Sequence, residues 1–386
     1  MILRTVIIVV FSFQLILNMT RPIISLYGSN LGASALEIGY LTAAYAFLPL
    51  LFSIHAGRAA DKMGDKIPVL GGFIGVGLGM AVPYLFDSLW ALYVSQVIVG
   101  ISHIFIVISL QNVIGNSAPA DKRDYYFSMF STAVSLGAVI GPVIGGYVAE
   151  NLSYQAVFST SCVVCILAFI LSLQLQSTAR NRGSANSNLL SSISLLKMLV
   201  LRKAMFSSAL ALYSRDIFMA YFPLYGKHLG LTTSTIGWII ALQGLFMVAV
   251  RFSLTRLTNA LGRDQILMAS IFIAGLSFLL IPMTEHVILL GLWSACMGAG
   301  LGCSQPLSMT TTYNASPKSR TGEVLGLRLA VNKASQLVAP LFFGLIGSSL
   351  SLLSVFIVSG AFLVGGSWII RPAKATTTET PMEEMS

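Results

Sequence analysis

A single acid and several bases stand inside apolar stretches of this sequence. Asp216 is the only carboxylate that falls near the middle of such a stretch, and Arg215 directly precedes it. A charged side chain in hydrocarbon costs at least about 2.5 kcal/mol, so charges in such a place mark a pathway or an ion pair. A buried carboxylate near basic groups can be placed so that protonation and ligand binding compete. Asp216 is therefore the first candidate for a proton-binding group, and a structural salt bridge with Arg215 or Lys333 is the alternative.

Polar side chains accompany these charges at helical spacing. Gln14, Asn18 and Arg21 occur at i, i+4 and i+7, so one face of a helix presents all three. The residues expected to face a substrate cavity are Gln14, Asn18, Arg21, Tyr213, Arg215, Arg328, Asn332, Lys333 and Gln336. Because bases outnumber acids in this set, the field in the cavity is expected to be positive. Such a field favours an anionic or zwitterionic ligand over a lipophilic cation.

His103 is the second candidate for proton binding. It stands in the apolar stretch "GISHIFIV", three residues after Gly100. Histidine is the side chain whose unperturbed charge change falls nearest to neutral pH. The alternative interpretation is a hydrogen-bonded packing residue that takes no part in proton transfer.

The composition indicates the environment that surrounds these charged residues. Of the 386 residues, 55% are hydrophobic and 10% are charged, and the mean hydropathy is +0.82. Ordinary soluble proteins have about 25% charged residues. Apolar stretches of about 20 residues, the length that crosses a bilayer, recur along the whole chain. We therefore predict an all-α membrane protein.

The sequence lacks the motifs of the main enzyme classes. It contains no G-x-S-x-G nucleophile motif, no G-x-x-x-x-G-K-[ST] phosphate-binding loop and no cluster of metal ligands. Cys162 and Cys165 form a C-x-x-C pair inside an apolar stretch, where two small buried side chains are the simpler interpretation. We expect no catalytic residue, no cofactor, no metal and no ATP-driven step within this chain.

Twelve transmembrane helices are predicted from the apolar stretches. They cover residues 4–27, 36–57, 67–87, 89–113, 125–149, 154–175, 204–226, 234–257, 265–283, 287–312, 322–347 and 350–370. Residues 176–203 are predicted to be a cytoplasmic linker whose second part forms an interfacial helix. The polar, acidic residues 371–386 are predicted to be a disordered cytoplasmic tail. The first stretch is interpreted as a retained span, because no cleavage-site pattern follows it.

Lysine and arginine are distributed very unequally between alternate loops. If the N-terminus is cytoplasmic, the outer loops carry only Lys227, and the inner loops and ends carry most of the other bases. This asymmetry predicts that both termini face the cytoplasm and that the chain lies in a cell membrane. The formal net charge of +9 therefore reflects membrane topology, and no nucleic-acid partner is expected.

The two halves of the sequence match each other when one is shifted by 198 residues without a gap. The shift pairs Gly28 with Gly226, Gly39 with Gly237, Gly64 with Gly262, Gly100 with Gly298, Pro142 with Pro340, and Gly146 with Gly344. The repeat predicts two six-helix bundles, residues 1–175 and 204–370, related by a pseudo-twofold axis along the membrane normal. Such pairs place a substrate site at their interface near the middle of the membrane.

The twelve spans, the repeat and the central linker together resemble the major facilitator superfamily over essentially the whole chain. The loop after the second span, "GRAADKMGDKIP", resembles the signature of that family. The resemblance implies a cytoplasmic gating loop formed by Gly57, Asp61, Lys62, Gly64 and Lys66. Asp65 departs from the pattern, because the family usually has a basic residue there. An ordinary positively charged loop is the alternative.

The stretch "SLGAVIGPVIGGYVAE" resembles the antiporter motif of the fifth span in this family. The matching residues are Gly137, Gly141, Pro142, Gly145 and Gly146. In the family, this motif marks exporters that exchange substrate for protons. Small residues at four-residue spacing also let two helices approach closely in lipid, so a plain packing face is the alternative.

Two departures qualify the resemblance. Many proton-coupled exporters of the family carry an arginine in the fourth span, where this sequence has Gln96, so a basic residue for proton coupling has to come from elsewhere. The shift of 198 residues also turns Gly137, Gly141 and Gly145 into Ser335, Ala339 and Phe343. The glycine face therefore belongs to the first half alone.

These observations predict a secondary active transporter that exports a small organic molecule in exchange for protons by alternating access. The expected cargo is an anionic or zwitterionic metabolite, a metallophore or a drug. A uniporter or a symporter that imports a small organic anion is the main alternative, and a membrane-embedded enzyme or scaffold has less support. The expected partners are the substrate, protons and the lipid bilayer, and the chain is expected to be a monomer.

Overall fold

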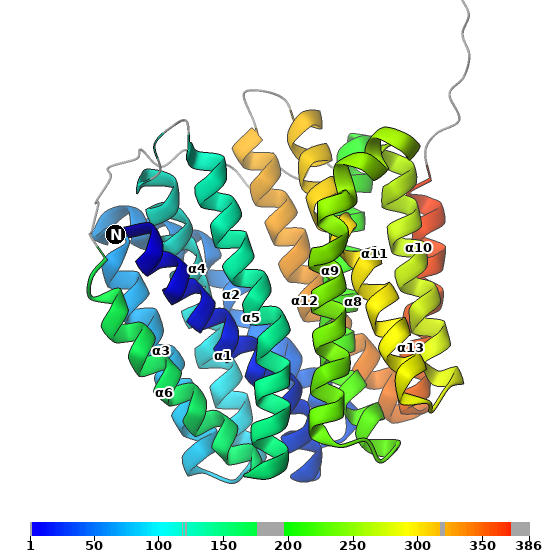
Figure 1. Cartoon of the computed structure of the whole chain (residues 1–386), viewed down its shortest axis with the longest axis horizontal. Coiled ribbons are helices and arrows are strands. Elements are labelled where there is room, and N and C mark those ends of the chain that lie inside the picture. Colours follow the sequence, from blue (N-terminus) through cyan, green and yellow to red (C-terminus); the bar gives the residue numbers. More distant parts are fainter. Residues whose placement is uncertain (1, 118, 120–121, 176–196, 317–320, 372–386) are drawn as a thin grey trace, which may run out of the picture.

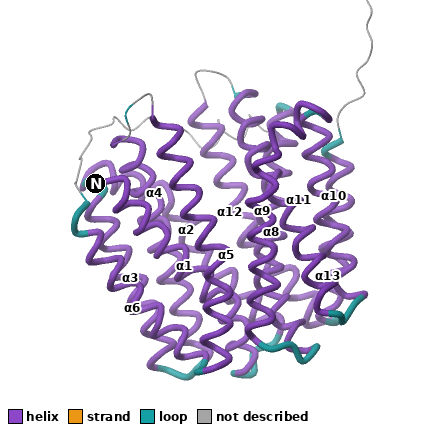
Figure 2. The backbone as a smooth tube through the Cα atoms, in the orientation of Figure 1, coloured by secondary structure: helices purple, strands orange, loops and turns teal. Residues whose placement is uncertain are grey.

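The structure is a computed structural model that describes residues 2–117, 119, 122–175, 197–316 and 321–371. Within these residues the regular secondary structure is entirely helical (Figure 2). The elements are α1 (Ile2–Asn30), α2 (Ala35–Met63), α3 (Lys66–Leu85), α4 (Leu89–Ser117), α5 (Arg123–Asn151), α6 (Tyr154–Ser172), α8 (Leu199–His228), α9 (Thr233–Leu261), α10 (Arg263–Leu280), η3 (Ile281–Met283), α11 (Val287–Ala315), α12 (Thr321–Ser349) and α13 (Leu352–Ile369). The prediction of an all-α protein is confirmed.

Each of the twelve predicted spans coincides with a helix. Several helices run further than predicted at one end, because the predicted limits followed apolar residues whereas the helices continue into polar sequence. Eleven of the described helices are long and apolar enough to cross a membrane, and α8 is the exception. The predicted linker lies mainly at 176–196, outside the described residues, and so does the predicted tail from residue 372 onward.

The low hydropathy of α8 follows from its charged residues and from its enclosure by other helices. It has 30 residues, so at about 1.5 Å per residue it is long enough to cross a bilayer, but it carries Arg202, Lys203, Arg215 and Asp216. It packs against α1, α11, α12 and α13, and most of its second half is buried. A helix enclosed by other helices does not need an apolar surface of its own. Residues 199–203, predicted to end a surface helix, instead form the first turn of α8.

The repeat is present in the turns of the structure. Glycines with positive φ in the described chain form two pairs under the shift of 198 residues. Gly32 and Gly230 have φ of 87° and 74°, and Gly64 and Gly262 have φ of 77° and 82°. Glycine adopts this region without the steric cost that a Cβ atom brings. The two halves therefore repeat their turn chemistry as well as their apolar pattern.

The N-terminal caps of the helices are repeated in the same way. The hydroxyl oxygen of Ser34 accepts a hydrogen bond from the backbone N–H of Glu37 at the start of α2. Thr232, which lies 198 residues later, accepts one from Thr235 at the start of α9. Such caps satisfy N–H groups that have no partner inside the helix. Another cap pair, Ser153 and Ser351, begins α6 and α13.

Close contacts between helices also follow the repeat. Gly100 of α4 packs against the backbone of Tyr45 in α2, and Gly298 of α11 packs against the backbone of Gln243 in α9. Tyr45 and Gln243 are themselves 198 residues apart. Small residues at these crossings allow two backbones to approach closely. The sequence repeat is thus a repeat of helix contacts.

Figure 1 shows helices α1 to α6 on one side of the molecule and α8 to α13 on the other. The main contacts that join the two sets are those of α2 with α12 and of α5 with α9. Gly39 of α2 lies against the backbone of Pro340, and Gly237 of α9 lies against the backbone of Pro142. These two crossings are related by the repeat. Both lie at the end of the molecule where α2 and α9 begin and α5 and α12 end.

Candidate functional site

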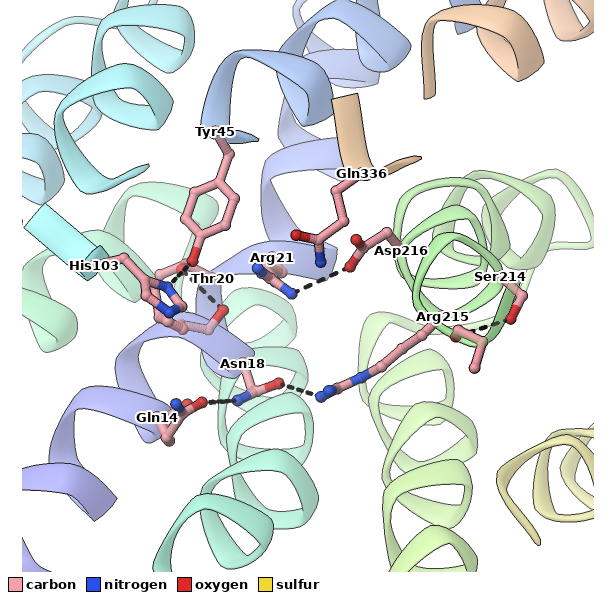
Figure 3. A network of polar contacts seen from close by, with 12 residues as sticks. Gln14, Asn18, Thr20, Arg21, Tyr45, His103, Ser214, Arg215, Asp216 and Gln336 are labelled. Atoms are coloured by element: carbon pink, nitrogen blue, oxygen red, sulfur yellow. Dashed lines mark hydrogen bonds and ion pairs between the residues drawn. The ribbon is translucent and has the colours of Figure 1, made fainter. Parts of the chain in front are cut away.

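An ion pair joins α1 to α8 at the centre of the candidate site. The Nη1 atom of Arg21 lies 3.5 Å from Oδ1 of Asp216, as Figure 3 shows. The two side chains are 23% and 12% exposed. The alternative of a salt bridge between Asp216 and either Arg215 or Lys333 was wrong in its partner. The guanidinium of Arg21 makes this contact instead.

Arg215, the neighbour of Asp216, makes a second contact with α1. Its Nη2 atom donates to Oδ1 of Asn18 at 3.4 Å. The Nδ2 atom of Asn18 donates in turn to the backbone oxygen of Gln14 at 2.7 Å and lies 3.4 Å from Oε1 of the same residue. Asn18 and Arg21 of the predicted stripe therefore contact consecutive residues of α8, whereas Gln14 contacts Asn18.

Tyr45 connects Arg21 to His103. The Cζ atom of Arg21 lies 4.7 Å from the centroid of the Tyr45 ring, which is cation–π geometry. The hydroxyl of Tyr45 is hydrogen-bonded to Nδ1 of His103. The His103 ring also meets the edge of Phe13, with ring centroids 5.3 Å apart. His103 thus has both a packing contact and a polar path toward Arg21.

Helix α12 reaches the ion pair through Gln336. Gln336, Gln96, Arg21 and Asp216 all line one small cavity of about 40 Å³. This volume holds water, but it is far below the ~300 Å³ or more of a typical small-molecule site. Nζ of Lys333 donates to Oε1 of Gln336 at 3.0 Å. Gln96, where the family resemblance leads one to expect an arginine, lines the same cavity as the guanidinium of Arg21.

A separate polar network lies inside the second half. Nη2 of Arg328 donates to Oε1 of Gln305 at 2.9 Å, and Nε2 of Gln305 donates to the backbone oxygen of Ser208 at 3.0 Å. Nε of Arg328 and Oδ1 of Asn332 are buried without a hydrogen-bond partner. The predicted polar face of α12 is therefore divided between this network and the cavity at Gln336.

Tyr213 is another predicted cavity residue that lies apart from the cavity at Asp216. Its ring is buried and stacks on Phe343, with centroids 5.8 Å apart. Its hydroxyl donates to the backbone oxygen of Ser359 in α13 at 3.4 Å. These contacts lie between helices of the second half, away from the residues around Asp216.

The predicted cavity bases other than Arg21 share one kind of partner. Arg215 donates to Asn18, Arg328 to Gln305, and Lys333 to Gln336. Each acceptor is a side-chain amide oxygen, which satisfies an N–H group without neutralising its charge. Because a buried charge without an opposite charge is costly, these contacts leave three bases able to gain from a negatively charged group.

The antiporter-like stretch packs against this site. A Cβ atom added at Gly137 would stand 2.9 Å from the carbonyl carbon of Gln14, and one at Gly141 would stand 2.9 Å from that of Asn18. Gly145 lies against the backbone of Met19. The three glycines therefore bring α5 onto the helix that presents Asn18 and Arg21. Pro142 and Gly146 instead meet α9, at Gly237 and Thr233.

The predicted gating loop is described only in part. Gly57, Asp61 and Lys62 lie in the last part of α2, where the side chains are outside the described set. Gly64 ends the helix with positive φ, and Nζ of Lys66 donates to the backbone oxygen of Leu173 at 2.6 Å. Lys66 thus joins the start of α3 to the end of α6. The gating role stays a prediction.

Sequence reasoning missed several residues of the site. Gln305 gave no signal, because a glutamine followed by Pro306 in an apolar stretch has no periodic partner. Tyr45 was not predicted to join Arg21 to His103, because that contact depends on how α2 faces α1 and α4. The 198-residue shift relates Tyr45 to Gln243 and Gly100 to Gly298, so these close contacts were available from the repeat.

Comparison with known proteins agrees with the fold. The family model of the Major Facilitator Superfamily matches residues 6–234 and 204–384. An uncharacterized transporter of this type from Methanocaldococcus jannaschii is 24% identical over 364 residues, which cover 92% of this chain and 94% of the relative. The multidrug resistance protein MdtG of Dickeya zeae is 23% identical over 362 residues, 90% of this chain and 88% of the relative.

The fold is also that of a solved transporter structure. A mutant form of the nucleoside transporter NupG superposes with a TM-score of 0.84 at 13% sequence identity. The superposition covers 96% of this chain and 99% of NupG. At this level of identity, the likeness concerns the fold alone.

Proposed function

This chain belongs to the major facilitator superfamily of transporters, and we propose that it exports a small zwitterionic molecule in exchange for protons. The ion pair between Arg21 and Asp216 carries the proposal, because it joins α1 to α8 beside a cavity that also reaches α4 and α12. The glycine face of α5 and the likeness to a multidrug resistance protein support export. The family and its relatives are transporters, so an embedded enzyme is no longer an alternative.

The proposed cycle moves residues 1–175 against residues 204–370. In the structure, α2 meets α12 and α5 meets α9 most closely at the end where α2 and α9 begin. The distribution of lysine and arginine supports assigning this end to the outside and both termini to the cytoplasm. Under this assignment, the structure is closed to the outside. The cycle requires the contacts at Gly39 and Gly237 to separate when cargo leaves.

Asp216 is the proposed proton-binding group. When ionised, its carboxylate attracts the guanidinium of Arg21 across the interface between α1 and α8. Protonation removes that attraction and leaves Arg21 with the ring of Tyr45 as its neighbour. The two states of Asp216 therefore favour different relations between α1 and α8. His103 is the proposed second proton-binding group, since Tyr45 joins it to Arg21.

Exchange of cargo for protons requires a particular charge on the cargo. A cationic group on the cargo would stabilise ionised Asp216, so its binding would expel a proton, which is the linkage that exchange requires. An anionic group on the same cargo would be held by the bases whose partners are amide oxygens. Arg215 is one of these bases and is adjacent to Asp216. A zwitterion meets both conditions.

A purely anionic cargo would couple in the opposite sense. Its binding beside Asp216 would favour the protonated carboxylic acid, because two negative charges repel each other in a buried site. Proton and cargo would then travel together, as in a symporter. The alternative function, import of a small organic anion, therefore differs from the proposed one in a measurable sign.

The test is the proton balance of binding. Purified protein in weakly buffered detergent solution is mixed with L-alanine or L-phenylalanine, which serve as zwitterionic probes, and an indicator dye follows the pH. We expect protons to be released on binding, and no release from the Asp216→Asn variant. The matched control is Asp264→Asn at an exposed position in the first turn of α10, which should release protons like the wild type.

The sign of the signal separates the candidates. Release that depends on Asp216 supports exchange of cargo for protons. Uptake of protons on binding would favour symport and contradict the proposal. Binding without any proton signal would indicate a uniporter and contradict it as well.

A further inference from the structure

A second cavity lies inside the first half, apart from the small cavity at Asp216. Its volume is about 190 Å³, and it is lined by residues of α1, α4 and α5. Apolar side chains form most of its wall, among them Val10, Phe13, Val107, Leu110, Phe130 and Val134. An apolar cavity of about 150 Å³ holds a benzene molecule. We call this space the ring cavity, since its size and lining suit a single apolar ring.

The ring cavity adjoins the charged site through two of its polar residues. Gln14 lines the cavity and is also contacted by Asn18, which accepts a hydrogen bond from Arg215. His103 lines it on another side and is hydrogen-bonded to Tyr45. Figure 3 shows Gln14 and His103 on the side of the network away from α8, with Arg215 and Asp216 opposite them. Gln14 and His103 therefore link the wall of the ring cavity to the charged site through side-chain contacts.

The repeat shows that this cavity is a property of the first half. The shift of 198 residues relates Val10, Val107, Phe130 and Val134 to Ser208, Gln305, Arg328 and Asn332. In the second half, these positions hold the polar network in which Arg328 donates to Gln305. The same place in the fold is thus an apolar cavity on one side and a basic network on the other.

We infer that the ring cavity receives a single apolar ring of the cargo, while the charged groups of the cargo contact Arg215 and Asp216. The inference rests on the proposed export of a zwitterion and adds the class of its apolar part. The cargo class is a zwitterion with one ring of aromatic size. Val134 and Val107 are specificity-determining residues, since they limit the volume available to the ring.

Four probes that differ by one group each can test this assignment. L-phenylalanine has the ring and both charges, L-alanine lacks the ring, phenethylamine lacks the carboxylate, and 3-phenylpropanoate lacks the amine. Binding is measured by calorimetry on the purified full-length chain. We expect the affinity for phenylalanine to be at least about tenfold higher than that for alanine, since burial of a phenyl group raises the affinity by at least that factor. Both single-charge probes are expected to bind more weakly than phenylalanine.

Filling the cavity should remove the preference for the ring. Val134→Phe on α5, or Val107→Phe on α4, is expected to bring the affinity for phenylalanine down to that for alanine. Thermal unfolding in detergent checks that each variant is folded, and the quantity compared is the ratio of the two affinities. The matched control is Val163→Phe on α6, where the side chain is 57% exposed and lines neither cavity. This control should keep the wild-type preference.

The outcomes separate this inference from the function on which it rests. Equal affinities for phenylalanine and alanine in the wild type, or no binding of phenylalanine, would overturn the ring assignment. Proton release on binding of alanine would then still support zwitterion exchange. If phenethylamine bound as tightly as phenylalanine, the anionic anchor would be wrong, and the cargo class of both proposals would fail.

Discussion

Helices α5 and α12 occupy equivalent places in the repeat but are built differently along one face. Gly137, Gly141 and Gly145 of α5 correspond to Ser335, Ala339 and Phe343 of α12. The glycines place α5 directly on the backbone of α1. Phe343 instead fills space between α12 and α8 by stacking on Tyr213.

The positions that α5 and α12 share have a different task. Pro142 and Gly146 meet α9 of the other half, and Pro340 and Gly344 meet α2 in the equivalent crossing. The shared residues therefore make the contacts that the proposed cycle must open, and the unshared glycines make contacts within the first six helices. This difference indicates that the glycine face holds Asn18 and Arg21 in place rather than forming a hinge.

The largest effect is expected where the two helices differ. Gly141→Leu would place side-chain atoms against the backbone of Asn18 and Met19, so α1 would have to shift with its polar face. We expect at least tenfold loss of transport and a loss of stability of about 1–3 kcal/mol. A proteoliposome assay measures the loss of transport, and thermal unfolding in detergent measures the loss of stability.

The equivalent change in the second half provides the control. Ala339 is only partly buried, and Phe343, four residues further along the same face of α12, packs against the ring of Tyr213. Ala339→Leu is expected to keep most of the transport activity and stability. If the two variants behaved alike, the proposed difference between α5 and α12 would be wrong.

A smaller and symmetric effect is expected where the helices agree. Gly39→Leu and Gly237→Leu each disturb one of these two crossings, which the protein can relieve by opening that end. Spin labels at Leu152→Cys and Leu350→Cys, two exposed positions 198 residues apart that follow α5 and α12, report the opening as a longer distance. The native cysteines are first replaced by serine or alanine.

Both glycine variants should lengthen the distance between the labels by a similar amount, with little loss of thermal stability. The unmodified double-labelled protein is the reference. A large change from one variant and none from the other would show that the two crossings are not equivalent, and it would argue against opening about a pseudo-twofold axis.

The sequence predicted those features that depend on local spacing. The positions of the helices follow from apolar stretches, and the turn glycines and caps, such as Gly32 with Gly230 and Ser34 with Thr232, follow the same shift as the rest of the repeat. The shared face of Gln14, Asn18 and Arg21 was also predicted, because it needs only the helical period.

Features that depend on how helices face each other could not be predicted from the sequence. The choice of Arg21 over Arg215 as partner of Asp216 is set by the rotation of α1 against α8, and no local pattern encodes that rotation. The ring cavity was missed because valines and phenylalanines that line a cavity, such as Val134 and Phe130, have the same periodicity as those that fill a core. Tyr213 shows the converse error, since an aromatic residue beside Arg215 can point into the packing between helices.

The most direct test of the account is the transport cycle of the Asp216→Asn variant. Proteoliposomes are loaded with unlabelled L-phenylalanine to measure exchange for labelled L-phenylalanine, and separate empty vesicles with an acidic interior measure accumulation driven by the pH gradient. Asparagine keeps a similar shape and a hydrogen-bonding oxygen but cannot bind and release a proton. With phenylalanine raised in concentration to offset the lost contact with its ammonium group, we expect the variant to retain exchange and to lose accumulation driven by the gradient. Accumulation equal to that of the wild type would contradict the central claim that Asp216 binds the transported proton.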